Sequence, residues 1–243
     1  MSGHSHWKSI KHKKGIADKA KSKVFSKLSQ AISIAVQEKG PDPETNSKLR
    51  LAIETARSFS LPRDTIERAI KKGSGELEGK KLEPITFEAY GPGGIAIIVE
   101  SITDNKNRTV NEIKQILNQN NGKLADAGAV KWLFERRGII TLRITNQYEY
   151  TNKEDLELKV IEAGAEDITW NNNALNIYTK IEDFDKVKKN LESQEIKIES
   201  ASLDWVAKEN VQTAQKYKEA TEKLFAALDE SDSVQEIYSN LKV

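Results

Sequence analysis

The stretch ITFEAYGPGGIAIIV, residues 85–99, decides the fold class. Apolar and β-branched residues lie on both sides of the turn-forming run GPGG at 91–94. This pattern predicts two strands, residues 85–90 and 95–99, joined as a hairpin.

The chain before this hairpin has the period of helices instead. Apolar residues recur every three or four positions through residues 16–38, and two shorter amphipathic segments follow. Asp42 is the expected N-cap of the middle helix, and Gly73 is the expected end of the third. The glycine-rich stretch 73–84, GSGELEGKKLEP, is predicted to be a linker.

The chain after the hairpin mixes both periods. A helix is expected over 109–120 and a strand over 130–134. Residues 138–203 follow the order strand, helix, strand, strand, helix, strand, which is that of a ferredoxin-like unit. A helix over 210–228 and a closing strand over 234–240 end the chain.

The fold class is therefore α+β, with a basic three-helix domain followed by two α/β domains, one inserted in the other. The predicted domains are 1–81, helical and nucleic-acid-binding; 82–137 plus 206–243, an α/β domain; and 138–205, the inserted ferredoxin-like domain.

Charge is distributed unevenly along the chain, although the net charge is only +1. Residues 1–81 hold 18 Lys and Arg against 9 Asp and Glu, a net charge of +9, and residues 82–243 hold 20 against 28, a net charge of −8. A basic segment of this kind suits a polyanionic partner, because each neutralised phosphate releases condensed counterions. The alternative is a solvated lysine tail without a ligand.

The candidate nucleic-acid-binding residues share positive or aromatic character in this basic segment. Lys19, Lys23 and Lys27 repeat every four positions, so they are expected to face solvent in one row. Trp7 could stack on an unpaired base or pack on the bundle. The full candidate set is Trp7, Lys8, Lys11, His12, Lys13, Lys14, Lys19, Lys21, Lys23, Lys27, Arg50 and Arg57.

A second, weaker anion site is possible at Lys106 and Arg108, which precede the helix expected at 109–120. The alternative is that this polar segment only caps the helix.

Other chemistry has little support in the sequence. Cysteine is absent, and His4, His6 and His12 lack further ligands at metal-binding spacing, so neither a metal site nor a cofactor is expected. No catalytic constellation is recognisable, and a metal-dependent nuclease is the remote enzymatic alternative. Neither a membrane-spanning segment nor a small-molecule substrate is expected, and the predicted location is the cytoplasm, or the mitochondrial matrix if the basic N-terminus serves targeting.

Five separated motifs give the chain a family resemblance: GHSHWKSIKHKK at the start, LPRDTIERAIKKGSGE from residue 61, YGPGG, TDNKNRT, and GAVKWLFERRG over 128–138. In this order they resemble the YebC/PmpR family of probable transcriptional regulators, whose mitochondrial relatives are translational activators of cytochrome c oxidase. The resemblance implies three domains, DNA binding and, in some members, work on the translating ribosome.

Two functions of different class follow. One is an RNA-associated translation factor whose partners are ribosomal or transfer RNA and possibly ribosomal proteins; the other is a transcriptional regulator that binds promoter DNA. No helix of the bundle places Asn, Gln and Arg in base-reading positions, which favours a binder of backbone or shape. The sequence favours the RNA function, with DNA regulation close behind.

Overall fold

The structure, a computed structural model, describes residues 18–143, 153–171 and 174–242, with side chains from residue 21 onward. Its contacts divide the chain into an inner unit, residues 135–206, and an outer unit that holds the chain before and after it. Each unit contains a four-stranded sheet, and the outer unit also contains the N-terminal helices. The α+β class is confirmed. The three-domain division with its boundaries stays a prediction.

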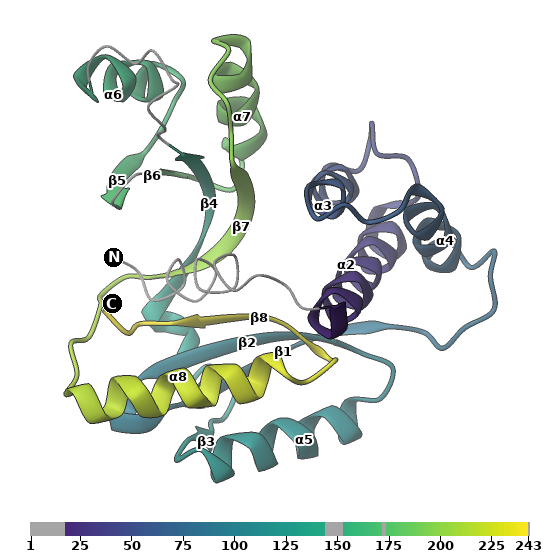
Figure 1. Cartoon of the computed structure of the whole chain (residues 1–243), viewed down its shortest axis with the longest axis vertical. Coiled ribbons are helices and arrows are strands. Elements are labelled where there is room, and N and C mark those ends of the chain that lie inside the picture. The colour runs from purple at the N-terminus through teal and green to yellow at the C-terminus, as the bar shows by residue number, and fades with distance from the viewer. Residues whose placement is uncertain (1–17, 144–152, 172–173, 243) are drawn as a thin grey trace. The chain divides into compact units, whose positions relative to one another are not determined.

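The N-terminal helices form one bundle around their apolar faces (Figure 1). They are α2 (Asp18–Lys39), α3 (Ser47–Ser58) and α4 (Arg63–Ser74). The three apolar stripes expected from the sequence meet in this core, which contains Ile32, Ala35, Val36, Leu49, Ile53, Ala56, Leu61, Ile66 and Ala69.

The start of α3 differs from the prediction, because Asn46 and not Asp42 is its N-cap. The Asn46 side chain is fully buried: its Oδ1 accepts from the Leu49 amide at 3.0 Å, and its Nδ2 donates to the carbonyls of Ala35 and Gly40 at 2.7 and 2.8 Å. An amide can both accept and donate, so one residue caps α3 and ties it to the end of α2. Asp42 instead forms a local turn by accepting from the Glu44 amide.

The end of α4 also differs from the prediction. Gly73 lies inside the helix, and Gly75, with φ 83°, is the left-handed C-cap. A Cβ on Gly73 would lie 2.6 Å from the Ser33 carbonyl oxygen and 2.7 Å from Val36 Cβ of α2. Gly73 is therefore a helix-packing residue, which allows α4 to approach α2 closely.

The outer sheet has the strand order β3-β1-β2-β8, built from β1 (Glu83–Tyr90), β2 (Ala96–Thr103), β3 (Lys123–Leu124) and β8 (Val234–Ser239). The expected hairpin is confirmed: β1 and β2 pair antiparallel from Glu83↔Thr103 to Tyr90↔Ala96, around the short helix η1 (Pro92–Gly94).

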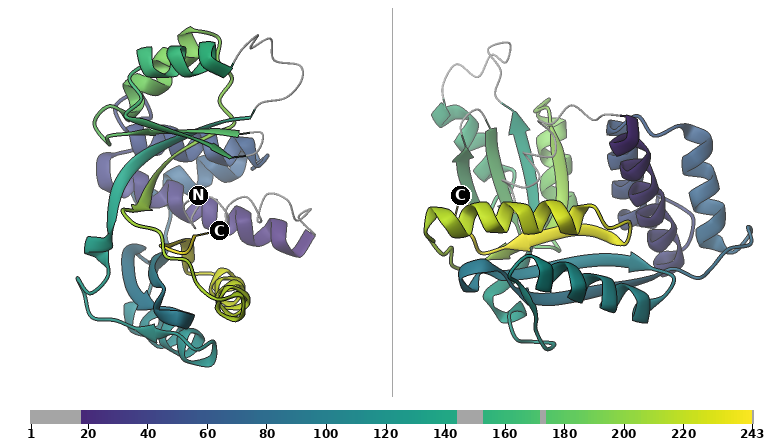
Figure 2. Two further views of the ribbon diagram at one scale, coloured as in Figure 1. Left: turned by 90° about the vertical axis from the view of Figure 1, so that its left-hand side faces the viewer. Right: turned by 60° about the horizontal axis from the view of Figure 1, so that its bottom comes forward.

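Helices α5 (Lys106–Gln119) and α8 (Gln215–Asp229) cover one face of this sheet (Figure 2). Alternate strand residues meet the two helices, as expected for a sheet with one helix-covered face. The core includes Phe87, Ala89, Ile97, Val99, Ile113, Leu117, Leu224, Phe225, Leu228 and Ile237.

In the segment after β3, residues 130–133 are not in a strand, contrary to expectation. The segment forms a 3₁₀ turn, η2 (Lys131–Leu133), before β4 (Phe134–Arg143). The reason is the Glu88 carboxylate on β1, which accepts the amides of Gly128, Val130 and Lys131 at 2.6, 2.7 and 2.8 Å. These amides are thereby withdrawn from any ladder.

The inner unit follows β4 with α6 (Lys153–Glu162), β5 (Asp167–Asn171), β6 (Ala174–Thr179), α7 (Phe184–Ser193) and β7 (Ser200–Ala207). Its sheet has the order β5-β6-β4-β7, and β6 pairs antiparallel with both β4 and β5. The last strand begins three residues later than the expected 197. The buried side chains of α6, α7 and the sheet include Leu142, Leu156, Val160, Leu175, Ile177, Val187 and Leu191.

Candidate nucleic-acid interface

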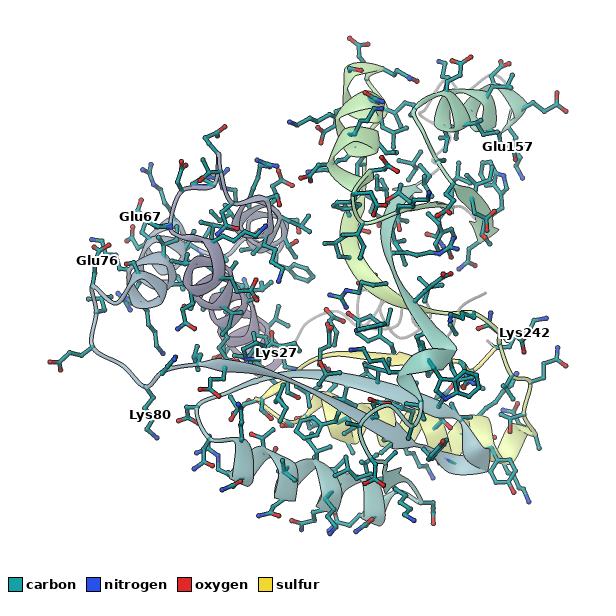
Figure 3. All side chains as sticks on the ribbon, turned by 180° about the vertical axis from the view of Figure 1, so that it is seen from behind. Lys27, Glu67, Glu76, Lys80, Glu157 and Lys242 are labelled. Carbon is teal, nitrogen blue, oxygen red and sulfur yellow. The ribbon has the colours of Figure 1, made fainter. Side chains whose placement is uncertain are left out.

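The lysine row of α2 is not free in the structure. Lys27 donates to Asp229 Oδ1 at 2.9 Å and to the Asp229 carbonyl at 3.0 Å, and Lys23 donates to Glu230 Oε2 at 3.0 Å and to the Glu230 carbonyl. Only 7% of the Lys27 side chain and 20% of the Lys23 side chain remain exposed. Figure 3 shows Lys27 where α2 meets the outer sheet.

These contacts correct the expectation that Lys23 and Lys27 face solvent. The end of α8 supplies both side-chain carboxylates and the unpaired carbonyls of a helix C-terminus, and cations are stabilised there. The two ammonium groups therefore cap α8 and attach the bundle to the outer sheet. The side chain of Lys19, at the start of α2, lies outside the described residues.

The other predicted residues differ in their exposure to solvent. Lys21 is exposed, with its ammonium group 5.7 Å from the centre of the Phe25 ring. Arg50 is half-buried and donates to the Pro43 carbonyl at 3.2 Å, whereas Arg57 is exposed. The remaining members lie outside the described residues: Trp7, Lys8, Lys11, His12, Lys13 and Lys14.

Sequence reasoning missed a cationic face on α4, made of Arg68, Lys71 and Lys72. Their spacing of three and four makes them neighbours on the helix surface. All three are exposed, and none has an ion-pair partner among the residues that the structure describes, whereas Arg63 on the same helix binds Glu67 at 2.8 Å. The signal is present in the sequence as ERAIKK, which is also the pattern of an ordinary helix end.

The second predicted anion site, at Lys106 and Arg108, has carboxylates beside its cations. Lys106 binds Glu83 at 2.7 Å, Arg108 binds Asp104, and Lys80 binds Asp104 at 3.0 Å. The hydrogen bond from Lys106 lowers the pKa of Glu83, and the hydrogen bond from Lys80 is the main cause that lowers the pKa of Asp104. The segment also caps its own helix, since Asn105 accepts the Arg108 amide at 3.1 Å. Anion binding at this position stays a prediction.

Glu88 is a buried carboxylate of the outer unit that accepts three backbone amides, and no sequence motif indicates it. Its residue is 7% exposed. Burial by itself raises the pKa of Glu88, but the three backbone donors outweigh burial and hold this pKa below the usual value. The ionised carboxylate thus fixes the segment that contains η2.

Metal-binding clusters and membrane-spanning helices are absent from the described residues. Over the described ranges, no group of three or more His, Asp or Glu side chains could hold a metal ion. No helix in the same ranges is long and apolar enough to cross a membrane.

Comparison with known proteins gives two family matches that together span most of the chain. Residues 5–76 match the TACO1/YebC protein N-terminal domain, and residues 82–241 match the TACO1/YebC second and third domain. The boundary between the two matches falls in the stretch that follows α4.

Full-length relatives and a solved structure agree with these matches. A "probable transcriptional regulatory protein" of Halothermothrix orenii is 46% identical over 100% of this chain and 96% of its own, and one of Caldanaerobacter subterraneus is 45% identical over 100% and 99%. The crystal structure of a conserved hypothetical protein from Aquifex aeolicus has a TM-score of 0.87 at 41% identity and covers 98% of this chain and 96% of that one. The resemblance noted in the sequence is thereby confirmed, and the chain belongs to the TACO1/YebC family.

Proposed function

We propose that the protein is a non-catalytic transcriptional regulator that binds duplex DNA through its phosphate backbone. The observation that carries this proposal is the α4 cationic face, Arg68, Lys71 and Lys72, exposed and without ion-pair partners among the described residues. Such a face gains affinity from each phosphate that it neutralises and does not need to contact bases.

A purely structural explanation exists for part of this face. Lys71 and Lys72 lie in the last turn of α4, where cations stabilise the helix dipole. That effect is worth only about 0.3–1 kcal/mol per charge at an exposed helix end. A binding role and a capping role therefore differ in what substitution changes: binding affinity in the first case, stability alone in the second.

The proposed ligand is DNA, whereas the sequence favours RNA. The relatives are named probable transcriptional regulatory proteins, which supports the DNA alternative over a translation factor. The structure adds that Lys23 and Lys27 are engaged within the protein, so the proposed DNA contacts come from α4, from exposed Arg57 on α3, and from the lysines of the N-terminal segment.

The finer architecture is part of the proposal. We assign residues 138–205 to a ferredoxin-like domain inserted in the outer α/β domain. The supporting observations are the element order β4-α6-β5-β6-α7-β7 and the strand order β5-β6-β4-β7, which places the first and third strands of the unit side by side in the centre.

The test compares duplex DNA of several sequences, transfer RNA and ribosomes as ligands at one salt concentration. Substituting Arg68, Lys71 and Lys72 together by Gln should weaken duplex binding about equally for every sequence, because phosphate contacts do not read bases. The matched control substitutes Lys180, Lys186 and Lys189, three exposed lysines of the inner unit, and should bind as the wild type does.

The competing function predicts a different result. Co-sedimentation with ribosomes combined with negligible duplex affinity would overturn the DNA proposal in favour of the RNA alternative. If the α4 variant and the Lys180, Lys186 and Lys189 variant bind duplex DNA with equal affinity, α4 is not part of the interface.

A further inference from the structure

One end of the outer sheet gathers exposed aromatic side chains. Among the residues that the structure describes, three exposed large hydrophobic residues are aromatic, and all three lie at the β1–β2 turn end of the sheet: Trp132, 65% exposed, Tyr90, 40%, and Tyr217, 36%. Exposed aromatic clusters of this kind are typical of binding surfaces.

A shared hydrogen-bond acceptor joins two of these rings, and the third ring packs on the turn. The Tyr90 hydroxyl and the Trp132 indole Nε1 both donate to the Ala129 carbonyl, at 3.3 and 3.0 Å. The Tyr217 ring packs on Gly93 of the adjacent turn, where a Cβ would lie 2.9 Å from the ring and φ is 74°. Only glycine fits both the conformation and the contact.

The backbone on both sides of Trp132 is fixed by hydrogen bonds and burial. The amides on both sides of Ala129 and the Lys131 amide bind the buried Glu88 carboxylate, Val130 is fully buried, and Leu133 accepts the Lys208 amide at 2.9 Å. A side chain fixed by its hydrogen bond and by a supported backbone loses little conformational entropy when it binds. The fold therefore presents an indole to solvent at a defined orientation.

The charge around these rings is locally positive. Exposed lysines flank them: Lys123 pairs with Tyr90 across the β-ladder, Lys131 adjoins Trp132, and Lys216 has its ammonium group 4.8 Å from the centre of the Tyr217 ring. Lys208 and Lys242 also lie at this end, and Asp126, Glu209 and Glu219 are exposed acids of the same segments, while the buried Glu88 carboxylate lies against the Lys131 amide. The excess of cations is notable because residues 82–243 together have a net charge of −8.

We propose that the surface defined by Tyr90, Trp132, Lys123 and Lys131 binds single-stranded nucleic acid, with an unpaired base stacked on Trp132 and phosphates bound by the lysines. Aromatic rings interleaved with cations are the general means of holding unpaired strands, since every base has a face that can stack. The α4 cationic face has no aromatic member, so it suits a duplex backbone, whereas this surface suits unpaired bases.

The experiment uses the full chain and a labelled oligo-dT, which does not form duplex. Trp132→Ala should weaken oligo-dT binding roughly 5- to 150-fold, the range for loss of one stacked base, and Trp132→Phe should recover part of the loss. The matched control is Leu158→Ala, which removes a side chain that is 58% exposed on α6. Circular dichroism establishes that each variant is folded.

A second readout reports the contact directly. In a chain with Trp7, Trp170 and Trp205 changed to Phe, the remaining Trp132 fluorescence should be quenched by oligo-dT. Unchanged fluorescence, or equal oligo-dT affinity of Trp132→Ala and wild type, would overturn the proposal and leave a protein partner as the occupant of this surface.

The experiments distinguish a failure of this proposal, which rests on Trp132, from a failure of the proposed function, which rests on α4. Trp132→Ala should leave duplex binding unchanged, and its effect on oligo-dT should persist when Arg68, Lys71 and Lys72 are changed to Gln. A loss of duplex binding equal to the loss of oligo-dT binding would show that Trp132 is not selective for unpaired bases and would refute the assignment.

Discussion

Replacement of Glu88 tests the physical basis of the turn that presents Trp132. The carboxylate accepts three amides at 2.6–2.8 Å from a position that is 7% exposed. Gln can keep its carbonyl oxygen on the Val130 and Lys131 amides, but its NH₂ group then faces the Gly128 N–H and the charge is lost. Because a hydrogen bond to a buried charged group contributes about 1.5–3 kcal/mol, we expect a loss of about 2 kcal/mol for Glu88→Gln and about 4 kcal/mol for Glu88→Ala.

The pH dependence of this loss has a definite sign. The folded-state pKa of Glu88 is below its unfolded value of about 4.3, so the ionised carboxylate stabilises the fold above that pH. Its contribution disappears as the pH falls through the folded-state pKa. The stability difference between wild type and Glu88→Gln should therefore be constant near neutral pH and shrink below about pH 4.

The assay is urea unfolding followed by far-UV circular dichroism at several pH values, with Glu222→Gln, an exposed residue of α8, as the control. A Glu88→Gln variant as stable as the control at neutral pH would refute the reasoning. A difference that grows on acidification would refute the sign.

Two further predictions concern the attachment of the bundle to the outer sheet and the packing within the bundle. In a double-mutant cycle, Lys27→Gln and Asp229→Asn should show a coupling energy of about 1–2 kcal/mol, because only 7% and 26% of these side chains are exposed. The control pair, Lys48→Gln and Glu38→Gln, is 52% and 34% exposed and should couple by less than about 0.5 kcal/mol. Equal coupling energies would show that burial does not strengthen the first pair. Gly73→Ala should destabilise the protein by about 1–3 kcal/mol in thermal unfolding, because the new Cβ would lie 2.6 Å from the Ser33 carbonyl oxygen. In the control, Gly79→Ala, the new Cβ meets only the flexible Lys72 side chain at 3.0 Å, so the change in stability should be nearly zero. Similar losses of stability at both positions would contradict the close approach of α2 and α4.

Periodicity predicted most of the elements because their burial is local and regular. The hairpin 85–99 and the helices of the bundle follow directly from apolar spacing, and the structure confirms them. Two misplaced helix boundaries have the same cause: a polar or small residue with a tertiary partner. Asn46, and not Asp42, is the N-cap of α3, because its side chain also donates hydrogen bonds to the end of α2. Gly73 remains inside α4 because α2 packs closely against it.

The candidate site was less predictable, because charge in a sequence does not specify what a side chain contacts. Lys23 and Lys27 follow the helical period correctly, but their partners, Asp229 and Glu230, are about two hundred positions away and no local pattern indicates them. Trp132 was expected inside a strand, and its exposure depends on Glu88, which lies forty or more positions earlier in the chain.

The salt dependence of duplex binding tests the central claim most directly. For wild type and variants, the logarithm of the binding constant is measured against the logarithm of the salt concentration by fluorescence anisotropy. If Arg68, Lys71 and Lys72 each meet a phosphate, changing all three to Gln makes the slope shallower by about three units, because each contact contributes about 0.9. The Lys180, Lys186 and Lys189 control keeps the wild-type slope. The same slope for wild type and both triple variants would contradict the assignment of α4 as the DNA-binding face.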